Sequence, residues 1–301
     1  MRLGDTLRNY LALTKPSIML LVVITGASGL VLEGSMINQP LNIFLVLFGL
    51  FCTGGSANAL NQYFERDIDA QMSRTRKRRP LPQGRITPAH ALTFSVTIGI
   101  IGCAVLWLSF NWLSASLALG TILFYGLFYT LYLKPTTAQN IVIGGAAGAM
   151  APVIAWAAAA NNLALAPWLL FLIIFLWTPP HFWALALYLQ EDYKLVKLPM
   201  MPVVAGEKST MRQMLWYSIA LVAVTLSLGV VDKGSGLLYL LAAGALGAVF
   251  LYKVWSMMRQ PSRQAQRSLF TYSIVYLLAL FAVVIAEGMV GLTDLGGLPR
   301  F

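Results

Sequence analysis

The sequence predicts an all-α polytopic membrane protein in which residues 1–301 form a single transmembrane domain. Hydrophobic residues make up 58% of the 301-residue chain and charged residues only 11%, a balance that soluble globular proteins do not show. Apolar runs long enough to cross a bilayer as helices recur along the whole chain. No polar segment between these runs is as large as a soluble domain. The composition therefore excludes a soluble globular protein.

Nine apolar runs, separated by polar breaks, are each long enough to form a membrane-spanning helix. They cover residues 16–34, 42–63, 89–110, 113–133, 139–159, 165–189, 210–231, 236–257 and 268–290. Only Asn111 and Trp112 separate the third run from the fourth, so we expect a tight turn there. The N-terminal residues show no short apolar region followed by a cleavage site. We therefore expect a retained polar segment that leads into the first span.

Two of the spans carry features beyond their hydrophobicity. In the fifth span, Gly144, Gly148 and Pro152 recur at four-residue spacing, which is typical of helices that pack closely against a neighbour in the membrane. In the sixth span, Pro179 and Pro180 remove backbone hydrogen bonds. We expect a kink there that a cavity or a neighbouring helix accommodates.

The positions of the basic residues predict how the chain is oriented in the membrane. With the N-terminus in the cytoplasm, nineteen of the 21 lysines and arginines fall on the inner side, and only Lys233 and Arg300 fall outside. This asymmetry follows the positive-inside rule, and it predicts a C-terminus on the outer side. Short cytoplasmic loops and contact with lipid headgroups therefore account for the formal charge of +10, and we expect no nucleic-acid partner.

The most polar stretch lies between the second and third spans, from Asn58 to Arg85, and contains seven basic residues. Asn61, Glu65 and Asp69 recur every four residues, so on a helix they share one face and extend over about 12 Å. Oxygen donors in this arrangement, followed by clustered arginines, favour Mg²⁺ holding a phosphate-rich substrate. One alternative is a basic loop that only orients the protein. Another is a set of salt bridges between the two carboxylates and Arg66, Arg74 or Arg76.

A second polar stretch, from Glu191 to Arg212, follows the sixth span on the same predicted side of the membrane. Glu191 and Asp192 offer further carboxylate oxygens, and Lys194 and Lys197 follow them closely. Two acidic clusters that face each other across a cavity open to the cytoplasm would hold a diphosphate through metal ions. Lysines and arginines would neutralise the remaining charge.

One ionisable residue lies inside the sixth span, where His181 directly follows the two prolines. Ionisable residues within membrane spans are costly to bury, so His181 is a candidate functional residue. The alternative is a histidine that only forms a hydrogen bond to a neighbouring helix.

Several segments resemble a known family. The segment NQYFERDIDAQMSRTRKRRPLP is similar to the NDxxDxxxD signature of the UbiA superfamily of intramembrane prenyltransferases, and nine spans suit that superfamily. Within it, the protoheme IX farnesyltransferases (heme O synthases) are resembled by LTKPSIMLLVVITG, QNIVIGGAAGAMAPVIAWAA, WTPPHFWALAL and EDYKLVKLPMMPVV. These segments extend over nearly the entire chain in the family's order. The WTPPHFWALAL block is far more specific than the aspartate-rich motif.

The resemblance implies a UbiA-type bundle of nine helices and a prenyltransferase activity. The implied reaction transfers the farnesyl group of farnesyl diphosphate to a vinyl group of heme B, with addition of water, to give heme O and diphosphate. The implied cofactor is Mg²⁺, and the implied catalytic residues are Glu65, Asp69 and Asp192. The other implied roles are metal ligation by Asn61 together with these three carboxylates, diphosphate binding by Arg66, Arg74 and Lys197, and heme ligation or water positioning by His181.

Three positions depart from the superfamily pattern. Gln62 replaces the aspartate of the Asn-Asp pair, and Glu65 stands where aspartate is usual. In the second motif, Val196 occupies the position of the next aspartate, which leaves the coordination of a second metal open. Glu191 is a possible substitute.

The family also implies an integral protein of a bacterial or archaeal cell membrane, with a site that opens to the cytoplasm. It further implies transfer of heme O to a heme A synthase or a terminal oxidase. Two other functions are compatible with the residues themselves. One is a UbiA-type prenyltransferase that acts on a quinone precursor, and the other is a heme or lipid transporter, which the prolines and His181 suggest.

Overall fold

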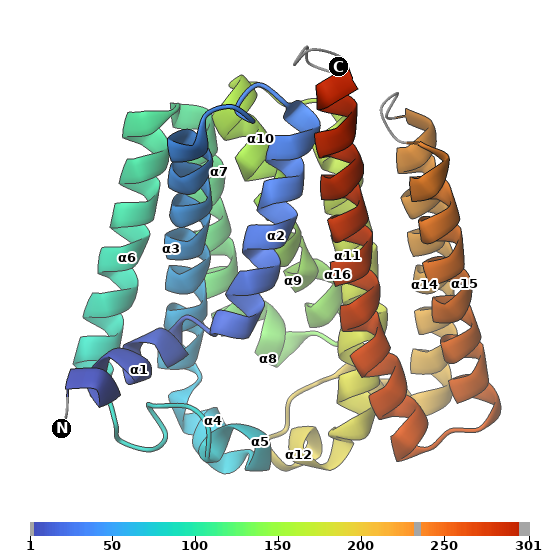
Figure 1. Cartoon of the computed structure of the whole chain (residues 1–301). Coiled ribbons are helices and arrows are strands. Elements are labelled where there is room, and N and C mark those ends of the chain that lie inside the picture. Colours follow the sequence, from blue (N-terminus) through green and yellow to red (C-terminus); the bar gives the residue numbers. More distant parts are fainter. Residues whose placement is uncertain (1–2, 232–235, 295–301) are drawn as a thin grey trace.

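The computed structural model describes residues 3–231 and 236–294, and all regular elements within these ranges are helices. Nine helical segments of the described chain are long and apolar enough to cross a membrane, which confirms the predicted number of spans. Together they form one bundle (Figure 1). The nine segments are α2 (Pro16–Glu33), α3 (Pro40–Phe64), α6 (Pro88–Ser109), α7 to α8 (Trp112–Thr136), α9 and α10 (Asn140–Ala160), α11 (Leu165–Tyr188), α14 (Gly206–Val231), α15 (Leu237–Arg259) and α16 (Arg263–Asp294).

The residues before the first span form a helix of their own, α1 (Leu3–Leu13), which lies across one end of the bundle (Figure 1). Leu7 and Leu11 are exposed one turn apart, so this helix presents an apolar face of the kind that rests on a membrane surface. Lys15 then adopts a left-handed conformation with φ of 55°, and Pro16 begins α2 directly after it. The polar segment predicted before the first span is thus a separate helix, which is joined to that span by a sharp turn.

The fourth span changes its helical geometry part-way along. It begins as α7 (Trp112–Leu123), continues as the π-helix η1 (Phe124–Leu133) and ends in α8 (Lys134–Thr136). The wider π-helical turns bring residues five apart together, and the Thr130 hydroxyl donates to the carbonyl oxygen of Tyr125 at 2.7 Å. Such stretches are rare and occur often at functional sites, and this one ends at a lysine that faces the acidic motif.

The fifth span is divided at Met150 into α9 (Asn140–Ala149) and α10 (Ala151–Ala160). Close packing is confirmed at two of the three predicted positions. A Cβ atom at Gly144 would lie 2.4 Å from the ring of Tyr129, and Pro152 approaches α2 so closely that its carbonyl oxygen would lie 2.5 Å from a Cβ atom at Gly29. Gly148 has no such neighbour within 4 Å, so the prediction of close packing is wrong there.

The turn between the third and fourth spans is as tight as predicted, because only Phe110 and Asn111 separate α6 from α7. Asn111 caps α7 by accepting a hydrogen bond from the backbone of Ser114 at 2.9 Å. Its amide nitrogen also donates to the carbonyl oxygen of Ala157 at 2.8 Å. One side chain therefore caps the fourth span and ties it to the end of the fifth.

The polar segments that the sequence places on one side of the membrane do lie together. Four short helices lie at the same end of the bundle as α1, while α16 ends at the opposite end (Figure 1). The outer basic residues Lys233 and Arg300 lie outside the described residues. The short helices are α4 (Arg66–Gln71), α5 (Ser73–Arg76), α12 (Gln190–Leu195) and α13 (Met201–Val204).

Candidate active site

The three oxygen-bearing residues of the first motif lie at the end of α3, where the helix breaks. Helix α3 ends at Phe64, Glu65 is its cap residue, and α4 begins at Arg66. Backbone hydrogen bonds nevertheless continue from Glu65 to Asn61 at 3.0 Å and from Asp69 to Glu65 at 2.8 Å. The predicted shared face is therefore kept, and all three residues are at most 3% exposed.

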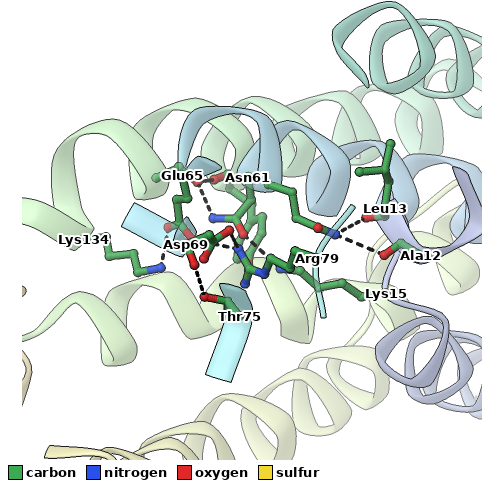
Figure 2. A network of polar contacts seen from close by, with 12 residues as sticks. Ala12, Leu13, Lys15, Asn61, Glu65, Asp69, Thr75, Arg79 and Lys134 are labelled. Carbon is green, nitrogen blue, oxygen red and sulfur yellow. Dashed lines mark hydrogen bonds and ion pairs between the residues drawn. The ribbon is translucent and has the colours of Figure 1, made fainter. Parts of the chain in front are cut away.

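Three basic side chains converge on these residues and form with them a buried polar cluster (Figure 2). Arg79 pairs with Asp69 and reaches Glu65 Oε2 at 3.5 Å, while Lys134 pairs with the other oxygen of Glu65. The Lys15 ammonium donates to Asn61 Oδ1 at 2.9 Å. The buried polar cluster is composed of Lys15, Asn61, Glu65, Asp69, Arg79 and Lys134.

The cluster is assembled from separate parts of the chain. Lys134 follows the π-helix η1, whose Thr130 accepts a hydrogen bond from Asn61 Nδ2 at 3.1 Å and so turns the amide oxygen towards Lys15. Thr75 donates to the carbonyl oxygen of Asp69 at 2.9 Å, which holds the loop carrying Arg79 against α4. Gln62, which replaces the usual aspartate, instead donates to the carbonyl oxygen of Leu13 at 2.9 Å and fixes the turn that presents Lys15.

The surroundings act differently on the two carboxyl groups. Burial tends to raise the pKa of Glu65, but the Lys134 and Arg79 charges outweigh burial and leave this pKa below its usual value. For Asp69, burial prevails over the attraction of Arg79, and the pKa lies above its usual value. Burial, reinforced by the Arg79 charge, holds the pKa of Lys15 well below its usual value. The cluster thus keeps Glu65 ionised and holds Asp69 less firmly in that form.

The alternative of salt bridges to the two carboxylates predicted the right kind of contact, but the arginines that it named are not the partners. In the described chain, Glu65 and Asp69 form no ion pair with Arg66, Arg74 or Arg76. Arg66 instead lies over the ring of Tyr63 at 5.0 Å, donates to the Tyr63 carbonyl oxygen at 2.9 Å and approaches Asp67 at 3.9 Å. Arg74, in α5 after the first motif, and Lys197, in the turn after α12, are both exposed.

A side-chain hydrogen bond joins the second motif to the first. Ser73, the first residue of α5, donates a hydrogen bond to Asp192 Oδ2 at 2.6 Å across 119 residues of sequence. Glu191 points away and pairs with Lys194 at 3.0 Å, where both side chains are at least half exposed. Tyr193, between Asp192 and Lys194 in the sequence, is buried, and burial raises the pKa of its hydroxyl. The structure brings the two motifs side by side but does not place Asp192 in the buried polar cluster.

His181 is held in a fixed orientation between α11 and α16. Its ring stacks on Trp177 at 4.2 Å and on Phe270 at 4.6 Å between ring centres, and Nδ1 lies 2.6 Å from the Ser273 hydroxyl. Because this hydroxyl donates its proton to the carbonyl oxygen of Phe270 at 2.7 Å, it accepts from His181 Nδ1. The hydrogen bond to a neighbouring helix is therefore present, and it leaves the lone pair of Nε2 free for a ligand.

The helix that carries His181 does not break at the two prolines. Helix α11 continues from Leu165 to Tyr188 with Pro179 and Pro180 inside it. Close to these prolines, the Thr178 hydroxyl donates to the Ile174 carbonyl oxygen at 2.8 Å and so adds a bond within the helix. Trp177 donates to the Ser273 carbonyl oxygen at 2.7 Å and ties the same segment to α16. Neighbouring groups thus hold the helix together around the proline pair.

Comparison with known proteins identifies the family of this bundle. The model of the UbiA prenyltransferase family matches residues 21–285. The chain belongs to the UbiA prenyltransferase family. A relative from Gloeobacter violaceus, named protoheme IX farnesyltransferase, is 46% identical over 284 residues, which cover 94% of this chain and 92% of the relative. A relative of the same name from Picosynechococcus sp. is 43% identical over 293 residues, which cover 97% of this chain and 92% of the relative.

Solved structures show that the UbiA fold extends over nearly the whole chain. A structure described as digeranylgeranylglyceryl phosphate synthase has a TM-score of 0.77 at 20% identity and covers 95% of this chain and 99% of its own. A UbiA homologue from Archaeoglobus fulgidus, bound to GPP and Mg²⁺, has a TM-score of 0.65 at 16% identity and covers 92% and 99%. Identities this low establish the fold alone. Membership of a prenyltransferase family makes the protein an enzyme, so the transporter alternative is wrong.

The donor set of this UbiA protein fits Mg²⁺. Asn61, Glu65 and Asp69 offer hard oxygen atoms that point to one place, and that place already attracts cationic side chains (Figure 2). No group of three or more His, Cys, Asp and Glu side chains within the described ranges could hold a metal on its own. Mg²⁺ suits such a partial site because it keeps waters and is completed by substrate phosphates.

Sequence reasoning missed the three basic members of the buried polar cluster. Lys15 and Lys134 each adjoin the polar end of a span, and each precedes a proline, in KPS and KPT. Arg79 is the last of four consecutive basic residues, and nothing in the sequence distinguishes it from Arg78. A signal was available in the position of the two lysines, because a lysine at a span end lies at the depth of the first motif.

Proposed function

We propose that this protein transfers the farnesyl group of farnesyl diphosphate to a vinyl group of heme B, with addition of water, and releases heme O and diphosphate. The observation that carries the proposal is the buried polar cluster, in which an acidic motif and three cationic side chains meet at one end of a membrane bundle. The relatives named protoheme IX farnesyltransferase support this choice of substrates over those of other UbiA enzymes.

On this proposal the buried polar cluster binds the diphosphate and neutralises its negative charge. The carboxylates of Glu65 and Asp69 and the amide oxygen of Asn61 would hold Mg²⁺, which supplies positive charge to the diphosphate leaving group. Arg79 and Lys134, released from the carboxylates, then bind phosphate oxygens in a site of low dielectric. Arg79 and Lys134 balance the two carboxylates, and Lys15 adds a third basic group, so the cluster suits a polyanionic ligand.

The farnesyl carbon–oxygen bond breaks when the negative charge on the leaving diphosphate is neutralised. The allylic cation then adds to the electron-rich vinyl group of heme B. Water captures the cation that forms beside the porphyrin and loses a proton, so that a hydroxyl group remains in the product. The free lone pair of His181 Nε2 would either ligate the heme iron or accept a hydrogen bond from this water. The transmembrane helices around the buried polar cluster and His181 exclude bulk water from the cation.

The remaining predicted residues belong to the outer part of the same site. Asp192 would join metal binding from the second motif, where Ser73 now holds it. Arg66 in α4, Arg74 in α5 and Lys197 just after α12 lie at this end and would contact the diphosphate as it enters. We place this end on the cytoplasmic side of a cell membrane because the basic residues collect there. The product would pass to a heme A synthase or a terminal oxidase.

Purified protein in detergent, supplied with heme B, farnesyl diphosphate and Mg²⁺, should yield heme O and pyrophosphate, detected by mass spectrometry and by a phosphate assay. A parallel reaction with hydroxybenzoate in place of heme B tests the quinone-precursor alternative. Chelation of Mg²⁺ should stop product formation. Prenylated hydroxybenzoate without heme O would overturn the choice of substrate while leaving the enzyme class intact.

A further inference from the structure

A pocket separate from the buried polar cluster lies between α11 and α16. Its volume is about 260 Å³, and its lining combines three apolar or aromatic side chains with an arginine and a threonine. Arg267 and Thr271 are exposed, whereas the other lining residues are half-buried. The lining residues are Leu185, Tyr188, Arg267, Phe270 and Thr271.

The mouth of this pocket is strongly cationic. Arg263, one turn before Arg267, lies over the ring of Tyr188 at 6.0 Å. Nearby on α15, Lys253 donates to Ser268 at 2.9 Å, and Arg259 lies over the ring of Trp255 at 5.2 Å. In the described part of the chain, none of these cations forms an ion pair with a carboxylate. Their charge is therefore available to an anionic ligand.

A seam of side chains between α11 and α16 leads from this pocket to His181. On α11, His181, Leu185 and Tyr188 recur at helical spacing and face α16. On α16, Arg267, Phe270 and Ser273 recur in the same way and face α11. Phe270 both lines the pocket and stacks on the His181 ring. From Arg267 to Ser273 the seam extends over about 9 Å of helix axis.

We propose that this pocket binds the propionate carboxylates of the heme acceptor, with Arg267 as their charged partner; the inference rests on the proposed function. Heme combines a large apolar ring with carboxylates on one edge, and the seam likewise combines apolar and aromatic side chains with cations at one end. The pocket is smaller than the roughly 300–1,000 Å³ of sites that enclose a whole ligand, so it takes the propionate edge and not the whole ring.

This assignment gives the two anionic substrates separate cationic sites. In the buried polar cluster, Arg79 and Lys134 already pair with carboxylates, whereas Arg263 and Arg267 pair with none in the described chain. A guanidinium pairs with a carboxylate through two parallel hydrogen bonds, which orient as well as attract it. Arg267 is therefore a specificity-determining residue for a porphyrin with free propionates.

The test compares heme B with its dimethyl ester, in which both propionates are uncharged, in wild-type protein and in Arg267→Gln. In zwitterionic nanodiscs with saturating farnesyl diphosphate, we expect Arg267→Gln to raise KM for heme B about fivefold to tenfold. With the dimethyl ester, the two proteins should have equal KM values. KM for farnesyl diphosphate should not change, and Arg267→Lys should restore most of the affinity. Arg8→Gln, which removes an exposed cation on α1 away from the pocket, should behave as wild type.

Equal KM changes with both porphyrins, or no change with either, would overturn the assignment. An effect that appears only when anionic lipid is present, and is the same for heme B and its ester, would assign the pocket to a lipid headgroup instead. Equilibrium titration of heme B and its ester by absorbance measures the same discrimination without turnover. Wild-type protein that binds heme through Arg267 but forms no heme O would contradict the proposed function and leave the pocket assigned.

Discussion

The two acidic motifs lie side by side at one end of the bundle, yet they differ in how their charges are balanced. Glu65 and Asp69 are 3% and 2% exposed, and each is paired with a basic side chain that is itself largely buried. In the second motif, the side chain of Glu191 is 77% exposed and pairs with a half-exposed Lys194. Asp192 is half-buried and bonded only to the Ser73 hydroxyl among the described contacts.

The difference indicates which half of the site is preformed. A carboxylate withdrawn from water needs a counter-ion at all times, so the first motif carries its own cations, which a bound metal ion would replace on the proposed function. The second motif remains near water and needs no such partner. We infer that the first motif provides most of the binding energy for the diphosphate and that the second adjusts to the bound ligand.

The largest effect is expected for Asp69→Ala, because this change removes a proposed metal ligand and leaves Arg79 buried beside fewer carboxylates. Farnesyl transfer should fall by about a thousandfold or more, as for loss of a key electrostatic group in an active site. Heme O production is measured by mass spectrometry, and the amount of protein in the membrane by immunoblot. Retained product at normal protein levels would contradict the metal assignment.

Arg79→Gln should separate two roles of the first motif. Without this guanidinium, KM for farnesyl diphosphate should rise by about a hundredfold, because a buried charge-assisted contact to phosphate is lost. Binding of Mn²⁺ in place of Mg²⁺, measured by electron paramagnetic resonance without substrate, should tighten because Arg79 no longer competes for Asp69. Arg78→Gln is the matched control, since Arg78 is exposed and forms no ion pair in the described chain. Weaker Mn²⁺ binding in Arg79→Gln would show that the arginine supports the metal site and does not compete with it.

Asp192→Asn tests the second motif, and a smaller loss of about tenfold is expected. If Asp192 ligates metal, this variant should also need more Mg²⁺ for half-maximal activity. Ser73→Ala removes only the hydrogen bond that now holds Asp192 and should cost about twofold, with an unchanged Mg²⁺ requirement. If activity depends on Mg²⁺ concentration in the same way in both variants and in wild type, Asp192 does not bind the metal and only joins the two motifs.

Stability gives a further comparison, in which two lysines form a matched pair. Lys134→Gln leaves the buried Glu65 with one cation fewer and should destabilise the protein by about 3 kcal/mol. Lys194→Gln breaks an exposed pair and should change stability by less than about 0.5 kcal/mol. Thermal unfolding in detergent compares the two. Similar losses for both variants would mean that the two motifs are equally shielded from solvent, against the contrast described above.

Much of the fold was predictable because the signals for it are local. Each span is recognised from about twenty consecutive apolar residues, and the number of spans follows without knowledge of any neighbour. The charge asymmetry in the loops likewise grouped the two motifs on one side, and both do lie at one end of the bundle. The spacing of Asn61, Glu65 and Asp69 predicted a shared face, which survives the helix break at Glu65 because the backbone bonds at four-residue spacing continue through it.

The contacts that make the site were decided only by the tertiary structure. Lys15 and Lys134 meet Asn61 and Glu65 because α2, α3 and the π-helical fourth span are rotated and shifted so that their ends converge. The choice of Arg79 over the other arginines follows from the path of a loop, and the Ser73–Asp192 contact joins residues 119 apart in sequence. Hydropathy and charge sum over neighbours along the chain and set which segments cross the membrane. The partners of each side chain depend on how those segments rotate and pack against one another, which no local pattern records.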